Sequence, residues 1–424
     1  MNLKLLKNKN LSLLLLGRFV SMFGSGVMQF AFSLYVLRLT GSASQFASVL
    51  VVAMIPMLLL GPISGVFVDW FDRKKLIVYL DLISGLIVGV MFLISVTSTI
   101  TMFHIYITVI CLSIITTLFN PAINTAIPSL VDKDDLLEAN SLNRVIMTIT
   151  MMISPMVGGA LFGIFGISII LLLNFVSFIL SAISEAFIDL KTPNKKHNDF
   201  SFNSFYNDLK SGINFILNHN IMKKIITLSF VANAFFSPAL SIGLIYIASM
   251  VIEVSDLQLG ILQSSLMVGS LLGLSITGTV AKKIKLTKVI YMALIIMGTL
   301  VCLIGFSSLP AYLNLFNNNL IPYLTIVVLA LIIGSAAVIT NVGMATLMQK
   351  EVPSDMLGRV SSVKETASLC ATPFGQIIFA GMYDTIGTFI PIMISGTVMV
   401  ISAVLFNYSV HKTPKEAGAS GSGF

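Results

Sequence analysis

The sequence has few charged residues. Lys, Arg, Asp and Glu make up 10% of its 424 residues, whereas 56% are hydrophobic and the mean hydropathy is +0.97. A soluble domain of this length needs a surface with many more charges. The composition therefore excludes a soluble protein and indicates a chain that folds in a lipid bilayer. Because apolar stretches recur along the whole chain, the first one predicts a membrane span rather than a cleaved export signal.

Cysteine and histidine are also scarce. The three cysteines and four histidines do not gather with carboxylates at the spacing of metal ligands, so we expect no metal site and no cofactor. The chain has no Gly-x-Ser-x-Gly or His-Glu-x-x-His motif and no Gly-Lys-Ser/Thr phosphate loop. These absences argue against a membrane-embedded enzyme and against a pump driven by nucleotide hydrolysis.

Long apolar stretches are abundant, and twelve of them are long enough to span a bilayer. Crossing about 30 Å of hydrocarbon takes roughly 20 residues in a helix. The sequence thus predicts an all-α membrane protein with twelve transmembrane helices, at residues 11–38, 46–68, 76–96, 102–129, 143–165, 168–189, 222–250, 257–280, 286–308, 320–349, 357–383 and 387–410.

Basic residues fall almost entirely on one side of these spans. With both termini in the cytoplasm, all Lys and Arg residues except Arg18, within the first span, and Arg38, at its outer end, lie near the inner face. This asymmetry predicts that orientation in a cell membrane. The formal charge of +7 then reflects topology, and we expect no nucleic-acid partner.

A long loop divides the spans into two sets of six. We expect an N-terminal bundle at residues 1–190, a cytoplasmic linker at 191–221, a C-terminal bundle at 222–412 and a tail at 413–424. Apolar side chains recur at helical spacing in the linker and predict an amphipathic helix on the inner membrane face, with Phe202, Phe205, Tyr206, Leu209, Ile213 and Ile216 on its apolar side.

The two halves show weak similarity to each other. Asp135, Leu137 and Ser141 after span four match Asp355, Leu357 and Ser361 after span ten. Duplicated bundles around a central cavity can rock about a site at the midplane, which is the basis of alternating access. The sequence therefore favours a secondary transporter, which we expect to act as a monomer.

The loop after span two carries a motif. It reads Gly-Val-Phe-Val-Asp-Trp-Phe-Asp-Arg-Lys-Lys over residues 65–75 and resembles the signature of the major facilitator superfamily, with Asp72 where the general pattern has glycine. That departure, together with Ile-Pro-Ser-Leu-Val at 127–131 and Ala-Asn-Ser-Leu at 139–142, resembles the macrolide-efflux-type branch. Siderophore exporters and lysophospholipid transporters share these motifs. The resemblance implies a major facilitator fold of two six-helix bundles.

The same resemblance implies a gating latch. It assigns the latch to Gly65, Asp69, Arg73 and Lys74, with Asp69 pairing with Arg73 near the start of span eleven. A carboxylate at a helix N-terminus contributes roughly 0.3 to 2 kcal/mol, which can bias two conformations without locking either. The alternative is that the basic run only anchors the topology.

Span five contains Ser-Pro-Met-Val-Gly-Gly at residues 154–159. It is similar to the Gly-Pro-x-x-Gly-Gly element of antiporters in this superfamily, with Pro155, Gly158 and Gly159 in the matching positions. Proline bends a helix and glycines let a second helix approach closely. The resemblance favours export over import, and tight packing alone is the alternative.

Uncharged polar side chains within spans are candidates to line a cavity. In hydrocarbon an unpaired polar group is costly, so such groups face the bundle interior or water. We expect a substrate cavity lined by Ser25, Gln29, Asn120, Asn124, Asn233, Gln263, Asn341 and Gln376. Hydrogen bonds between helices are the alternative for each of them.

Carboxyl groups within spans are rare, and Asp81 and Glu365 are the two candidates for proton coupling. Either carboxyl can instead pair with a nearby base, which for Glu365 is Lys364 or Arg359. Because no carboxylate lies deep in the bilayer, we expect neutral, weakly basic or zwitterionic amphiphiles as substrates. The sequence favours a proton-coupled exporter of macrolide-like compounds, with a siderophore exporter or a lysophospholipid translocator as the alternatives.

Overall fold

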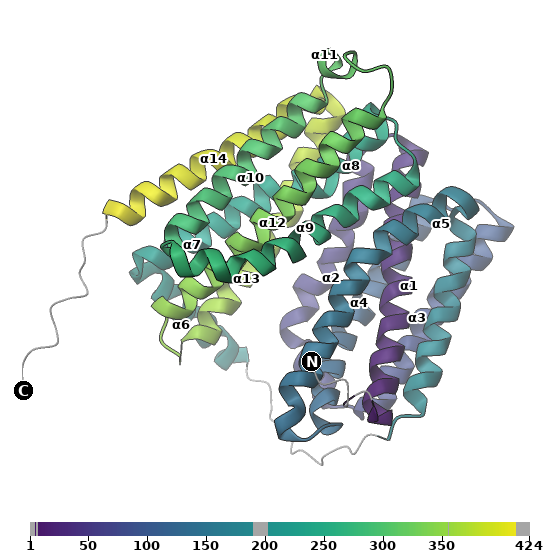
Figure 1. The fold of residues 1–424 in the computed structure, drawn as a ribbon. Coiled ribbons are helices and arrows are strands. Elements are labelled where there is room, and N and C mark those ends of the chain that lie inside the picture. The colour runs from purple at the N-terminus through teal and green to yellow at the C-terminus, as the bar shows by residue number, and fades with distance from the viewer. Residues whose placement is uncertain (1–4, 6, 190–201, 355, 413–424) are drawn as a thin grey trace, which may run out of the picture. The chain divides into compact units, whose positions relative to one another are not determined.

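The structure is a computed structural model that describes residues 5, 7–189, 202–354 and 356–412. All regular structure in these residues is helical. The chain divides into two compact units (Figure 1). Unit 1 contains Met1–Phe200 and Glu253–Ser264, and unit 2 contains Ser201–Ile252 and Ser265–Phe424.

Unit 1 is built from five long helices and the start of a sixth. Its first helix begins where the Asn8 side chain accepts hydrogen bonds from two free backbone N–H groups and ends at Gly41, which has the positive φ that favours glycine. The helices are α1 (Lys9–Thr40), α2 (Ala43–Asp69), α3 (Arg73–Thr97), α4 (Met102–Ala126), α5 (Leu136–Ala186) and the first turns of α9 (Asp256–Lys283).

Helix α5 contains two membrane spans. Its 51 residues would extend over about 77 Å if they were straight, more than twice the thickness of the hydrocarbon layer. Gly166 breaks the helix with φ of 71° and ψ of −172°, a conformation that side chains disfavour. The predicted spans at 143–165 and 168–189 meet at this break, and the second returns along α1 and α3 (Figure 1).

Unit 2 contains the remaining spans. Its seventh span runs from α7 (Asn220–Val231) to Val251 and includes three π-helical turns, at Ala232–Phe236, Ala239–Gly243 and Ile247–Val251. The other helices are α6 (Phe202–Asn218), α8 (Leu244–Tyr246), α10 (Leu286–Ser307), α11 (Pro310–Leu313), α12 (Leu320–Glu351), α13 (Leu357–Ile386) and α14 (Phe389–Lys412).

The twelve-helix architecture is confirmed. Ten described helices are long and apolar enough to cross a membrane, and α5 counts twice. The twelfth span is α13, whose 30 residues have the required length although Arg359, Lys364 and Glu365 make its first turns polar.

The surface is apolar and several charges are inside. Leu59, Leu86 and Ile164 are 70%, 66% and 72% exposed on three helices of unit 1, as expected of side chains that face lipid. Meanwhile Arg18 and Glu185 are 1% exposed. This distribution is the reverse of that in a soluble protein.

Part of the predicted linker lies outside the described residues, which resume at α6. Helix α6 covers the second half of the linker and packs on α13 where Gly212 meets the Arg359 backbone. Its position on a membrane surface, the boundaries of the bundles and the cytoplasmic location of the termini stay predictions.

Candidate transport and gating sites

The loop between α2 and α3 places the signature residues at a helix start. Asp72 is the N-cap of α3, because its Oδ1 accepts a hydrogen bond from the Lys75 backbone at 2.9 Å. Arg73 donates from Nη1 to the backbone carbonyl of Thr125 at the end of α4, at 3.0 Å. The side chain of Asp69 lies outside the described residues, so its pairing with Arg73 stays a prediction. Lys74 is half-buried, and the space around the Gly65 Cα is open.

The antiporter-like element of α5 packs against α1 with one face. Ser154 donates to the Phe23 carbonyl at 3.4 Å. One turn later, a Cβ added to Gly158 would come within 3.0 Å of the Val27 carbonyl oxygen. The small residues of the element thus bring the backbones of α5 and α1 close together, as glycines do in membrane helices.

The other face of the same element packs against the first turns of α9. A Cβ on Gly159 would overlap the carbonyl oxygen of Asp256, and a Cβ on Gly260 would overlap the carbonyl oxygen of Pro155. Backbone therefore meets backbone in this α5–α9 contact, which consists of Pro155, Gly159, Asp256 and Gly260. Gly158 and Gly159 serve different neighbours although they are adjacent in sequence.

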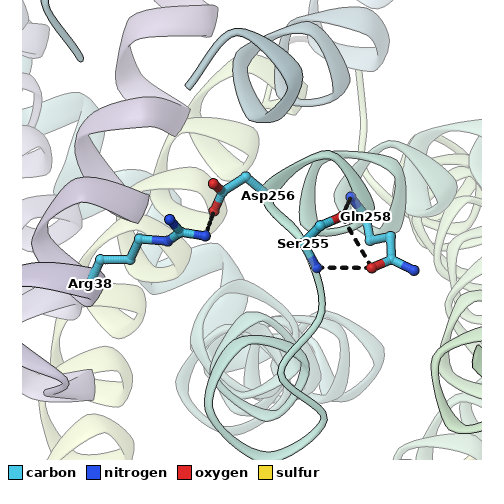
Figure 2. Close-up of polar contacts among 4 residues, drawn as sticks. All are labelled: Arg38, Ser255, Asp256 and Gln258. Atoms are coloured by element: carbon cyan, nitrogen blue, oxygen red, sulfur yellow. Dashed lines mark hydrogen bonds and ion pairs between the residues drawn. The ribbon is translucent and has the colours of Figure 1, made fainter. Parts of the chain in front are cut away.

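An ion pair reinforces the α5–α9 contact. Arg38, at the end of α1, approaches Asp256 with 2.7 Å between Nη2 and Oδ1 (Figure 2). The Asp256 side chain is 3% exposed, whereas that of Arg38 is 54% exposed. The Arg38 guanidinium also lies 5.8 Å from the centre of the Phe162 ring on α5, which is within reach of a cation–π interaction.

Asp256 lies at a well-capped helix start. Ser255 and Gln258 bond reciprocally: the Ser255 backbone donates to the Gln258 Oε1 at 2.8 Å, and the Gln258 backbone donates to the Ser255 hydroxyl at 3.4 Å (Figure 2). This arrangement is a capping box, and a carboxylate in the first turn also interacts favourably with the helix dipole.

A second group of charges is buried inside unit 1. Arg18 on α1, Asp81 on α3 and Glu185 on α5 are 1%, 2% and 1% exposed. Arg18 and Asp81 both act electrostatically on Glu185, and the Ser181 hydroxyl lies beside both carboxyls. One Arg18 nitrogen, Nη2, donates to the Asn120 side chain at 3.2 Å. We call Arg18, Asp81, Ser181 and Glu185 the buried charge cluster.

The cluster was only partly predictable. Asp81 is a predicted coupling residue, and it lies here beside a second carboxyl that the sequence analysis missed. The other predicted coupling residue, Glu365, is exposed on α13. Glu185 lies at the end of α5, one residue before Ala186, where a glutamate is as much expected to face water as to face the bundle.

The predicted cavity residues fall into three groups by exposure. Gln29, Asn124 and Asn341 are exposed, Gln376 is buried, and Ser25, Asn120, Asn233 and Gln263 are partly buried. Asn120 is engaged by Arg18, so in this structure it bonds to another helix. None of the eight is thereby established as a substrate contact, and their role in binding stays a prediction.

Two of these residues, Asn233 and Gln376, make hydrogen bonds between the π-helical seventh span and α13 within unit 2. Thr372 of α13 donates to the Asn233 side chain at 3.2 Å, and Gln376 donates from Nε2 to the Ser241 hydroxyl at 3.4 Å. A Cβ on Gly375 would overlap the Ala234 carbonyl oxygen, so the two helices touch between these hydrogen bonds. π-Helical turns often occur at functional sites.

The fold defines a class of protein: a polytopic helical membrane protein with small residues at its helix contacts. Comparison with known proteins supports this class. The family described as Major Facilitator Superfamily matches residues 14–368, and the chain belongs to this superfamily. It is therefore a multi-pass membrane transporter rather than an enzyme.

The chain is similar over most of its length to proteins that are named as efflux proteins. It is 25% identical over 402 residues to macrolide efflux protein A of Streptococcus pyogenes, covering 92% of this chain and 93% of that one. It is 22% identical to the multidrug efflux pump Tap of Mycobacterium tuberculosis (strain ATCC 25618 / H37Rv), covering 92% of both. Among solved structures, a bacterial homologue of the iron transporter ferroportin in the inward-facing state matches with a TM-score of 0.73 and 18% identity, covering 96% of this chain and 99% of that one, and shows the fold alone.

Proposed function

We propose that this transporter exports amphiphilic small molecules, such as macrolide-like compounds, by alternating access in the cell membrane, and that proton entry drives the export. Similarity to efflux proteins over 92% of the chain supports the direction and the substrate class. A siderophore or a lysophospholipid is the alternative substrate.

One structural observation carries the proton coupling: the Asp81 carboxyl is 2% exposed within a membrane span. An ionisable group at such a place is costly and marks ion or proton pathways in transporters. Glu365 is exposed, so burial favours Asp81 of the two candidates.

Membership of the Major Facilitator Superfamily supports the alternating-access part of the proposal, because two related bundles can rock about a site at the midplane of the membrane.

The experiment is accumulation of a labelled macrolide in cells with and without the protein, before and after collapse of the proton gradient. We expect cells with the protein to accumulate less macrolide, and we expect accumulation to rise to the level of cells without it when the proton gradient is collapsed. Cells with the Asp81→Asn variant should show that higher accumulation even with the gradient intact. Glu365→Gln is the matched control and should export normally. An unchanged accumulation, with the protein shown in the membrane, would disprove macrolide export and leave labelled lysophospholipid and siderophore as the next substrates.

A further inference from the structure

The charges of the buried charge cluster do not balance. If all groups are ionised, the cluster contains one guanidinium and two carboxylates and has a net charge of −1. A net charge inside a protein that is itself in hydrocarbon is strongly disfavoured. Uptake of a single proton makes the cluster neutral.

The cluster also lacks the hydrogen bonds that would stabilise two carboxylates. Among the described residues, both Glu185 oxygens, Oδ2 of Asp81 and Nη1 of Arg18 are buried without a well-aligned hydrogen-bond partner. The Ser181 hydroxyl lies within reach of both carboxyls, and its single O–H can serve only one carboxylate at a time. Four buried residues from three helices thus come together with too few hydrogen bonds for two carboxylates, which is unusual in a native structure.

Helix packing makes this arrangement possible. A Cβ on Gly17 would meet the Ser181 hydroxyl at 3.1 Å and the Glu185 side chain at 3.4 Å, so the absence of a side chain at Gly17 lets α5 approach α1 here. Arg18, the next residue, carries the positive charge. Asp81 joins from α3, which packs on α5.

We propose that Arg18, Asp81, Ser181 and Glu185 form one proton-binding site, in which Asp81 and Glu185 share a single proton and Arg18 balances the remaining carboxylate. Ser181 can donate to the carboxylate and accept from the protonated group, because a hydroxyl does both. Neither carboxyl alone is the proton carrier. The use of this proton for transport rests on the proposed function, whereas its presence does not.

The proposal makes a specific statement about single substitutions. In Asp81→Asn or Glu185→Gln, Arg18 and the remaining carboxylate already sum to zero, so no proton is needed. In Arg18→Met the two carboxyls have no cation, so both take a proton. Asp81 and Glu185 are therefore equivalent in this test, although they lie on different helices. Asp189→Asn, at an exposed carboxyl four residues after Glu185, is the matched control.

The test is infrared spectroscopy of the purified full-length protein in lipid vesicles at neutral pH, where a protonated carboxyl gives a C=O band distinct from that of a carboxylate. Relative to the wild type, Asp81→Asn and Glu185→Gln should each lose one such group, Arg18→Met should gain one, and Asp189→Asn should change nothing. Loss of the band in only one of the two single variants would overturn the shared proton, and loss in neither would overturn the site.

Folding is checked separately by size-exclusion chromatography. The double variant Asp81→Asn/Glu185→Gln leaves the Arg18 guanidinium buried without a counter-charge and should aggregate, and addition of Arg18→Met should restore a monodisperse peak. A stable double variant would show that Arg18 does not depend on these carboxyls and would contradict the site. If the infrared result holds but macrolide accumulation is unchanged, the proposed function fails and the proton site stands.

Discussion

The ion pair between Arg38 and Asp256 has one buried and one half-exposed partner, so its two halves should differ in importance. Arg38→Gln leaves a carboxylate that is 3% exposed without its cation, which costs about 1–3 kcal/mol. Asp256→Asn leaves an arginine that can turn to water, and we expect a change below about 1 kcal/mol. Thermal unfolding of the detergent-solubilised protein measures both.

The double variant Arg38→Gln/Asp256→Asn, together with the two single variants and the wild type, forms a double-mutant cycle. It should be more stable than Arg38→Gln alone, because the buried charge is gone. If Asp256→Asn destabilises as much as Arg38→Gln, or if the double variant is the least stable of the three, then burial of the Asp256 carboxylate does not determine the energetics of the pair.

Individual residues differ in how far the sequence predicts their roles. Asp72 stands where the general family pattern has glycine. The structure explains an aspartate at this position, because Asp72 is the N-cap of α3, a role that aspartate fills well. The sequence indicated Asp81 because carboxylates are rare within spans. It could not indicate Glu185, because a glutamate near the end of a span has the same local pattern whether it points to water or into the bundle.

At the scale of helices, a pair of glycine substitutions separates helix packing from helix propensity. Gly159→Ala places a methyl group on the carbonyl oxygen of Asp256, so α5 and α9 must separate at a cost of about 1–3 kcal/mol. Gly61→Ala, within α2, meets nothing within 4 Å and should stabilise its helix by up to about 1 kcal/mol.

Thermal unfolding should therefore move in opposite directions for these two variants, and loss of macrolide export is expected only for Gly159→Ala. Equal shifts would mean that the close approach of α5 to α9 contributes nothing to stability.

Helix positions were the most predictable feature of the chain. Each predicted span overlaps an observed helix, and its limits lie within a few residues of the observed ones except at the start of span five, where the helix begins at Leu136 rather than at 143, because bilayer thickness imposes a minimum length that apolar composition reveals directly. The π-helical turns of the seventh span were not predicted, because apolar composition does not distinguish a π-helical turn from an α-helical one. The sequence identified the small residues of span five but not that Gly158 faces α1 and Gly159 faces α9, because those neighbours are distant in sequence.

At the scale of the whole molecule, the distribution of basic residues predicts an orientation that labelling can measure. Helix α9 runs over 28 residues, or about 42 Å, and therefore has its ends on opposite sides of a bilayer. Glu253 precedes it and Lys285 follows it, and both side chains are exposed. The positive-inside rule places Lys285 in the cytoplasm, because Lys282, Lys283 and Lys288 surround it.

We therefore expect a cysteine at position 253 to react with a membrane-impermeant maleimide in intact cells, in a protein whose three native cysteines are replaced by serine. A cysteine at position 285 should react only after permeabilisation. The reverse labelling pattern would mean that the protein has the opposite orientation in the membrane, and that protons move through the buried charge cluster in the opposite direction. Labelling of both positions in intact cells would instead show that α9 does not span the membrane, because only a spanning helix keeps its two ends in separate compartments.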